Sequence, residues 1–318
     1  MQKRTFIKML GLALPAGQAF AQAGSGRNVR VIVPLQAGSS NDMVARVLCA
    51  QMTTILGQNF VVENKVGGNG SIGTMEVVRA APDGLTLLLA SNSPLAANIA
   101  FSKNMAYDPR TDLTPIGGAS LTNHVVMVKA NSPIRTFADF LAYAKQRPGR
   151  VSVGYSTTSV QVQIATMNKL AGIDLLPVPY KGSPATITDV IGGVLDATLT
   201  DPGNAMVHVK GGTLRALAVG SLKRNPVALD WPAISETLPG YDFPSWNALV
   251  GPAGMPREMV NRLSAALMQA QKHPDVISHF AAGGTTSLVL SPDELKAYIS
   301  SETTKWVRLA REANIQPE

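Results

Sequence analysis

The sequence is poor in the residue types that build disulfides and metal centres. Among its 318 residues are one cysteine and four histidines, and aromatic residues make up 5%. The single cysteine, Cys49, excludes an internal disulfide, and its place in a helical pattern favours a buried small residue over a reactive thiol. The histidines share no metal-ligand spacing with carboxylates (His124, His208, His273 and His279). We therefore expect neither a disulfide nor a metal site.

Long apolar runs and clusters of one charge are lacking as well. No stretch approaches the ~18 continuous apolar residues that a helix needs to cross a bilayer. Charged residues make up 15% of the chain, and the formal net charge of +7 comes from scattered Lys and Arg rather than from a basic run. Because aromatic residues are also rare, this charge indicates solubility and an attraction for anionic ligands. Nucleic acid is not an expected partner.

Residues 1–23 have the order of a secretory signal peptide. Three basic residues and no acid precede a short apolar stretch at 9–14, and small residues then permit cleavage after Ala21 or Ala23. Cleavage would lower the formal charge from +7 to +4. Residues 3–8 are similar to a degenerate twin-arginine signal, and export through the Sec route is equally compatible. The sequence therefore predicts an exported protein.

Short apolar runs alternate with helical patterns along the rest of the chain. Such alternation is typical of mostly parallel sheets with helices on both faces. There are too many elements for one sheet, so we expect two α/β domains with a cleft between them. The predicted strands are 29–34, 60–63, 85–90, 125–128, 151–155, 176–180, 197–200, 214–219 and 246–250. The predicted helices are 42–56, 74–81, 161–171, 184–192 and 203–210, with others capped by Thr136, beginning at Pro256 and opening with a capping box at Ser291.

The loop after the first predicted strand, residues 34–42, combines a glycine, two serines and a helix start. A helix N-terminus with free N–H groups and nearby hydroxyls can bind an oxyanion, with Ser40 or Asn41 as the cap. The local sequence alone favours an ordinary capped helix start. Loops after strands remain the place where a ligand is expected in open parallel sheets.

The glycine-rich segment 67–73 is superficially similar to a dinucleotide-binding fingerprint, through Gly68, Gly70 and Gly73. It follows the second strand rather than the first, and residues 91–94 hold no acid where a ribose would need one. A flexible turn at the mouth of the cleft is the favoured interpretation. No cofactor is expected.

Catalytic constellations are sparse. The chain has no Gly-x-Ser-x-Gly elbow, and no base can be assigned to any of its serines. The sequence therefore argues against an enzyme. The alternatives are a secreted α/β hydrolase that uses a serine of the cleft, and a receptor that reports its ligand to a membrane signalling protein.

Several segments together resemble the tripartite tricarboxylate transporter substrate-binding proteins, also called Bug-type receptors. The resemblance runs from Val29 to Ile315. The segments that carry it are Val-Ile-Val-Pro at 31–34 with its Gly-Ser-x-x-Asp loop, Val-Val-Glu-Asn-Lys at 61–65, Ala-Ala-Pro-Asp-Gly-Leu-Thr-Leu-Leu at 80–88, Val-Pro-Tyr-Lys-Gly-Ser-Pro-Ala at 178–185, Leu-Arg-Ala-Leu-Ala-Val at 214–219, Pro-Ala-Gly-Met-Pro at 252–256 and the closing helix with Trp306.

The resemblance implies a type II periplasmic-binding-protein fold, in which two doubly wound α/β domains close around a central cleft. It places domain 1 at 24–122 plus 222–318 and domain 2 at 123–221. It implies a monomeric periplasmic protein that captures a small organic carboxylate, performs no catalysis, and delivers its ligand to membrane transporter subunits.

The resemblance also implies that two loops hold the carboxylate as a pincer, through backbone N–H groups, hydroxyls and water. The first loop contributes Leu35, Ala37, Gly38, Ser39, Ser40 and Asp42, and the second contributes Thr157, Thr158, Ser159 and Gln161. Ser91, Asn92, Tyr180 and Asp201 are expected to line the cleft. Asp201 could accept a hydrogen bond from a ligand or cap the following helix.

Two departures from the family pattern concern the ligand. Ser39 stands where the family's first loop usually has a second glycine, which adds a hydroxyl and stiffens the turn. The second loop is shorter than usual and lacks the family's glycines and histidine. A preference for di- or tricarboxylates is therefore not carried over.

Overall fold

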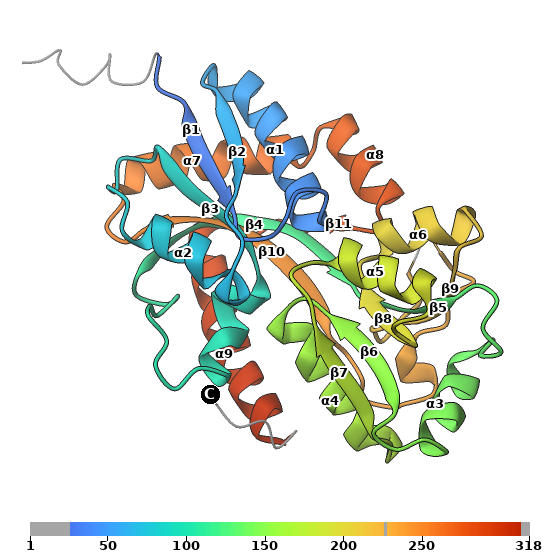
Figure 1. Cartoon of the computed structure of the whole chain (residues 1–318). Helices are drawn as coiled ribbons and strands as arrows, with labels where there is room; N and C mark the ends of the chain where they lie inside the picture. The colour runs from blue at the N-terminus through green and yellow to red at the C-terminus, as the bar shows by residue number, and fades with distance from the viewer. Residues whose placement is uncertain (1–25, 226–227, 313–318) are drawn as a thin grey trace, which may run out of the picture.

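The computed structural model describes residues 26–225 and 228–312, so the predicted signal peptide lies outside the described residues. Two sheets, each covered by helices, form two lobes that lie side by side (Figure 1). Lobe 1 has the strand order β11-β4-β10-β3-β1-β2, and lobe 2 has β7-β6-β8-β5-β9. The expected architecture of two α/β domains is confirmed.

The strands of lobe 1 are β1 (Val29–Val33), β2 (Phe60–Asn64), β3 (Thr86–Ser91), β4 (Leu113–Asn123), β10 (Pro244–Pro252) and β11 (Thr286–Ser287). Its helices are α1 (Ser40–Leu56), α2 (Ser71–Val78), α7 (Arg257–Ala270), α8 (Pro274–Ala282) and α9 (Pro292–Glu312). The short turns η1 (Gly68–Gly70), η2 (Ser93–Ala97) and η3 (Asn98–Ala100) complete it. The expected glycine-rich turn is thus η1.

The strands of lobe 2 are β5 (Val125–Lys129), β6 (Val151–Tyr155), β7 (Leu175–Pro179), β8 (Ala197–Thr200) and β9 (Leu214–Val219). Its helices are α3 (Phe137–Lys145), α4 (Thr158–Ala171), α5 (Ser183–Gly192) and α6 (Pro202–Lys210). The turn η4 (Ile234–Glu236) lies on the return path to lobe 1. Thr136 caps α3, as predicted, and the structure shows a full capping box there with Asp139.

The prediction of mostly parallel sheets was wrong. In lobe 1, β10 runs antiparallel to both β3 and β4, and β11 runs antiparallel to β4. In lobe 2, β5 runs antiparallel to both β8 and β9. Strands β5 and β10 are each the first strand of a lobe after the chain has crossed from the other lobe. A crossover helix makes neighbouring strands parallel only when it joins two strands of the same sheet. No such helix precedes β5 or β10, so these strands can run antiparallel to their neighbours.

The two crossings between the lobes lie against each other. Only His124 separates β4 from β5, and its carbonyl accepts the Gly220 N–H at 2.8 Å. On the return path, the Phe243 N–H donates to the Gly220 carbonyl at 3.2 Å. The chain therefore passes between the lobes through two segments that are hydrogen-bonded to each other.

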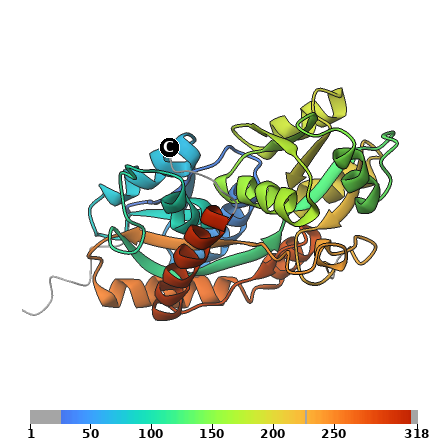
Figure 2. The same ribbon diagram turned by 90° about the horizontal axis from the view of Figure 1, so that it is seen from below.

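Side chains of the lobe 1 sheet alternate between two apolar layers. Ile32 and Leu88 face a core shared with lobe 2, where α4 contributes Val160. Val31 and Leu87 face the opposite layer, covered by α1, α7 and α8. Figure 2 shows α9 crossing one face of the lobe 1 sheet and reaching towards lobe 2. Helices thus cover both faces, as expected.

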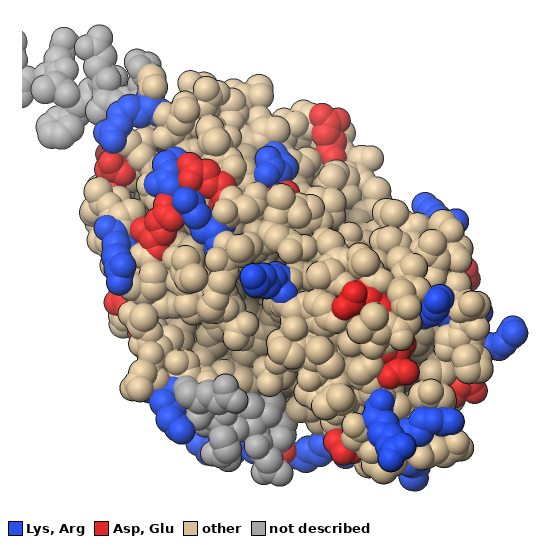
Figure 3. Space-filling model, viewed as in Figure 1, with Lys and Arg blue, Asp and Glu red and all other residues tan. Residues whose placement is uncertain are grey.

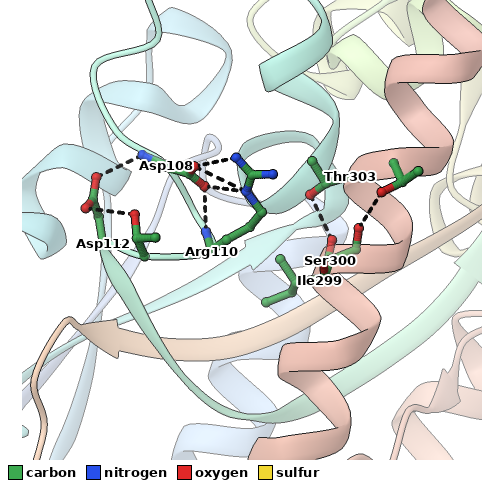
Figure 4. Close-up of polar contacts among 8 residues, drawn as sticks. Asp108, Arg110, Asp112, Ile299, Ser300 and Thr303 are labelled. Carbon is green, nitrogen blue, oxygen red and sulfur yellow. Dashed lines mark hydrogen bonds and ion pairs between the residues drawn. The ribbon is translucent and has the colours of Figure 1, made fainter.

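Two polar arrangements fix the edge of lobe 1. Ahead of β4, Asp108 and Arg110 form an ion pair of 2.6 Å, and Asp112 accepts the Asp108 N–H at 2.8 Å (Figure 4). Within α9, the Thr303 hydroxyl donates to the Ile299 carbonyl at 2.8 Å. These contacts set where β4 begins and keep a buried threonine satisfied inside the helix.

Cys49 is buried in α1, as predicted, and burial raises the pKa of its thiol to about 12. Because the thiolate is the reactive form, we expect no reaction with a thiol reagent at about pH 8 while the protein is folded. The check is the absorbance of a disulfide reagent with native and denatured protein. One thiol should react only after denaturation, and full labelling in native buffer would contradict the buried position.

Candidate functional site

Loops that follow strands of both lobes meet between the sheets. The Ser93 hydroxyl donates to the Ser159 hydroxyl at 3.1 Å, and the Thr158 hydroxyl donates to the Asn98 side-chain oxygen at 2.8 Å. We name this boundary the interlobe cleft, after the ligand cleft that the sequence predicts; its segments are residues 34–42, 91–98, 155–161, 180–183 and 200–204. Figure 3 shows few charged residues on the surface between the lobes. Most charged residues of this face lie towards its periphery.

The helix cap that shapes the first loop lies one or two residues before the predicted position. Ser39 is the N-cap of α1, and its hydroxyl accepts the Asp42 N–H at 3.4 Å. Neither Ser40 nor Asn41 caps the helix, so that prediction was wrong. Gly38 has a φ of +79°, which explains a glycine before the cap, because side chains disfavour this left-handed region.

Asp42 organises the first loop from inside. Its carboxylate accepts the Gly38 N–H at 3.0 Å and the Asn64 side-chain amide at 3.0 Å, and it forms an ion pair of 2.9 Å with Arg46. The Asn64 amide also donates to the Leu35 carbonyl at 2.9 Å. Burial works to raise the pKa of Asp42, but the bonds from Arg46, Gly38 and Asn64 outweigh it and hold that pKa below its ordinary value.

The exposed side of the first loop presents donors. Ala37 and Gly38 are exposed, and Ser40 is half-buried at the start of α1. Within the described chain, the backbone N–H groups of Ser40 and Asn41 have no hydrogen-bond partner. Such N–H groups at a helix N-terminus, together with the helix dipole, favour an anion. The side-chain amide nitrogen of Asn41 is also buried and unpaired.

The second expected loop is mostly the first turn of a helix. Thr157 is the N-cap of α4, and Thr158, Ser159 and Gln161 belong to the helix itself. The Thr157 and Ser159 hydroxyls lie 3.1 Å apart, and Ser159 also donates its backbone N–H to Ser93 at 3.2 Å. Several of these polar groups therefore join the lobes to each other.

Ser93 and Asn98, the lobe 1 partners of these groups, were missed by sequence reasoning. They lie 66 and 60 residues from Ser159 and Thr158 along the chain. Their only sequence signal is their position after β3, at the carboxyl end of a strand.

At the end of β3, Ser91 and Asn92 are buried. Asn92 has no exposed surface, and neither its side-chain nitrogen nor its oxygen has a hydrogen-bond partner in the described structure. Asn247 of β10 lies opposite Ser91 in the sheet, and its side-chain oxygen is also unpaired. Sequence reasoning missed Asn247, because its place opposite Ser91 depends on the antiparallel register.

At the end of β8, Thr200 is fully buried and its hydroxyl has no partner among the described residues. The next residue, Asp201, caps α6 and accepts the Asn204 backbone N–H at 3.2 Å and its side-chain amide at 3.0 Å. Burial raises the pKa of Asp201, and no ion pair to it is present in the described structure. Of the two roles considered for Asp201, the structure shows the helix cap. Thr200 was missed.

Tyr180 and its neighbours form the lobe 2 rim of the cleft. The Tyr180 hydroxyl donates to Asp189 of α5, and this bond raises the pKa of Tyr180. Its polar end is thus engaged within lobe 2. Two residues on, Gly182 lies so close to the Gln36 side chain of the first loop that no side chain fits at 182 without displacing it. This contact between Gln36 and Gly182 was also missed.

No metal-binding group of three or more ligands occurs within residues 26–225 and 228–312. None of the described helices is both long and apolar enough to traverse a bilayer. His124 lies at the first crossing, with its Nδ1 3.0 Å from the Gln163 side-chain nitrogen, and burial lowers its pKa to about 4. Its imidazole is therefore neutral at ordinary pH.

Comparisons with known proteins agree with this geometry. The model of the tripartite tricarboxylate transporter family receptor matches residues 44–315. Protein BugT of Bordetella pertussis is 31% identical over 96% of this chain and 94% of its own. Rpa4515 of R. palustris, solved with adipate, has a TM-score of 0.89 and 28% identity, covering 92% of this chain and 99% of its own. MatC of Rhodopseudomonas palustris, solved with bound malate, has a TM-score of 0.83 and 27% identity, covering 89% and 98%.

Proposed function

The chain belongs to the tripartite tricarboxylate transporter receptor family, and on that premise we propose how it works. It is a solute-binding receptor of the periplasmic type that captures a small organic carboxylate between its lobes and does no chemistry on it. The observation that carries the proposal is the N-terminus of α1 at the interlobe cleft, with the free N–H groups of Ser40 and Asn41. The adipate and malate of two structural relatives support a carboxylate as the ligand class.

The site residues have two kinds of role in this proposal. Ser40, Asn41 and the first turn of α4 supply N–H and hydroxyl groups to one carboxylate, where both helix dipoles favour negative charge. Asp42 and Ser39 hold the first loop in shape without facing the ligand. Ser91, Asn92 and Asp201 line the cleft, and Tyr180 contributes the apolar part of its ring at the rim.

Closure follows from the two crossings. We propose the division into domain 1 (24–122 plus 222–318) and domain 2 (123–221), which turn about His124 and Gly220. The segment that returns to lobe 1 still contacts lobe 2 after Gly220, since Val219 pairs with Ala233. Closure brings the α4 N-terminus onto η2 and η3, where Ser159 bonds to Ser93 and Thr158 bonds to Asn98.

The cellular setting follows from the family and the N-terminal pattern. We propose that the chain is exported through residues 1–23, by the Sec or the twin-arginine route, and acts in the periplasm as a monomer. Its partners would be the membrane subunits of a tripartite transporter. A hydrolase is not favoured, because the receptor family binds its ligands.

The expected result of a ligand screen is a rise in the thermal midpoint of the mature protein with one class of carboxylate. The panel would hold succinate, malate, adipate, citrate, aspartate, benzoate and nicotinate, each beside its uncharged amide as the control. Ligand at about 100 times its Kd adds about 2.7 kcal/mol to stability, which shifts the midpoint by several degrees. Equal shifts with acid and amide, or no shift with any acid, would contradict a carboxylate receptor.

A further inference from the structure

Among the described residues, two buried side chains of the interlobe cleft have neither a hydrogen-bond donor nor an acceptor as partner. The Asn92 side chain has neither of its polar atoms paired, so this conclusion holds whichever way its amide is turned. The Thr200 hydroxyl, which both donates and accepts, is unpaired as well. Both residues are fully buried. Unpaired buried polar groups are rare in native proteins, and a bound ligand or an ordered water can satisfy them.

Each group lies at the end of a strand, near one contact between the lobes. Asn92 precedes Ser93, which bonds to Ser159 at 3.1 Å, and Ser159 lies 3.1 Å from the Thr157 hydroxyl. Thr157 follows β6, which pairs in parallel with β8, the strand that ends at Thr200. Asn92 therefore neighbours this contact in lobe 1, and Thr200 ends the strand next to it in lobe 2, so both groups belong to the boundary at which the proposed ligand binds.

The chemistry of these groups differs from that of an anion site. An ionised carboxylate offers only acceptors, so it satisfies N–H and O–H donors and leaves the Asn92 side-chain oxygen unpaired. Asp201, next to Thr200, is a buried acid without an ion pair in the described structure. A second carboxylate here would be repelled, whereas a hydroxyl or an ammonium group would be attracted.

We propose that the ligand carries, beside its carboxylate, a hydrogen-bond donor that is received by Asn92 and Thr200. The donor is a hydroxyl or an ammonium group, so the preferred substrates are hydroxy- or amino-carboxylates rather than plain diacids. This inference rests on the proposed function as a carboxylate receptor. Malate, the ligand of one structural relative, has such a donor, and adipate, the ligand of another, has none.

Calorimetric titration of the mature protein with matched probes tests the inference. The sets are succinate, malate and aspartate; glutarate, 2-hydroxyglutarate and glutamate; and phenylacetate, mandelate and phenylglycine. Within the set that binds best, the hydroxyl or the amino member should bind at least about tenfold tighter than the plain acid, a difference of about 1.4 kcal/mol. Which of the two is tighter identifies the donor.

Thr200→Val provides the variant, because it removes the hydroxyl and keeps the side chain's shape. In this variant, the hydroxyl or amino member of a set should bind only about one to three times as tightly as the plain acid. The plain acid should bind as it does to the wild type. Ser264→Ala is the matched control, because Ser264 also has a buried unpaired hydroxyl, on α7. It should leave the preference unchanged. Asn92→Ala should reduce the preference from the lobe 1 side.

Two results would overturn this inference without contradicting the proposed function as a carboxylate receptor. One is a plain acid that binds as tightly as its hydroxyl and amino analogues. The other is a Thr200→Val protein that loses affinity for all members of a set equally, since that shows a role in shape alone. If no member of any set binds, the proposed carboxylate receptor is contradicted together with this inference.

Discussion

Replacement of Asp42 by alanine is expected to weaken ligand binding by about a hundredfold, or about 2.8 kcal/mol. The side chain is 3% exposed and holds Gly38, Asn64 and Arg46 together. Without it, the 35–39 loop loses the bonds that present the Ser40 and Asn41 N–H groups. Titration with the carboxylate identified in the thermal screen measures the effect.

The same change should lower the free energy of unfolding by about 2–3 kcal/mol, less than for a fully buried ion pair, because Arg46 is half-exposed and can turn to water. Asp42→Asn keeps the shape and should fall between wild type and alanine. Asp83→Ala is the control, since Asp83 is exposed, has its ion pair with exposed Arg27, and accepts a backbone N–H, that of Leu85, outside the first loop. If Asp42→Ala binds the ligand with unchanged affinity, the first loop is not part of the binding site.

The pKa of Asp42 gives this prediction a pH dependence. Because its pKa is lower in the folded protein than in the unfolded chain, its contribution to stability is present above the ordinary aspartate pKa of 3.8. That contribution is lost as the pH falls through the lowered folded value. Wild-type protein should therefore lose more stability on acidification than Asp42→Ala, and urea titrations at several acidic pH values would show the two converging.

Glu302→Ala is expected to lower the free energy of unfolding by about 2–5 kcal/mol, because it leaves two buried indole N–H groups without an acceptor. One oxygen of Glu302 accepts the indole N–H of Trp246 at 2.9 Å and that of Trp306 at 3.1 Å. Both indoles are fully buried in the core shared by the lobes. No other acceptor for these N–H groups occurs in the described structure.

Urea unfolding followed by tryptophan fluorescence measures this loss. Glu302→Gln keeps an oxygen acceptor and should cost less than the alanine variant. Glu312→Ala on the same helix is the matched control, because its carboxylate is exposed and pairs only with Arg308. A change of less than about 0.5 kcal/mol in Glu302→Ala, as for surface substitutions, would show that the indoles find other partners.

Local signals predicted the elements that they specify directly. The capping boxes at Thr136 and Ser291 both form, because the cap and its partner lie three residues apart. Buried strands such as β1 and β3 were equally visible as short apolar runs. By contrast, β4 was missed, since Pro115 and Gly117 interrupt its pattern. It exists because β10 pairs with it along its whole length.

The candidate site divides in the same way. The Gly38–Asp42 loop is a local motif, and the sequence showed its glycine, hydroxyls and helix start. The partners across the cleft are Ser93 with Ser159 and Asn98 with Thr158, pairs more than fifty residues apart. No spacing rule relates such residues, because their distance depends on how two separate sheets are oriented.

The sequence by itself determined the α/β class and the receptor family, and it predicts export and an anion-binding loop after the first strand. Apolar periodicity, helix caps and family motifs are properties of neighbouring residues, so they can be read along the chain. Only the tertiary structure decided which polar groups meet in the cleft and which remain unpaired. Asn92 and Thr200 are ordinary residues in the sequence, and they gain meaning because folding buries them from two lobes without giving either a partner.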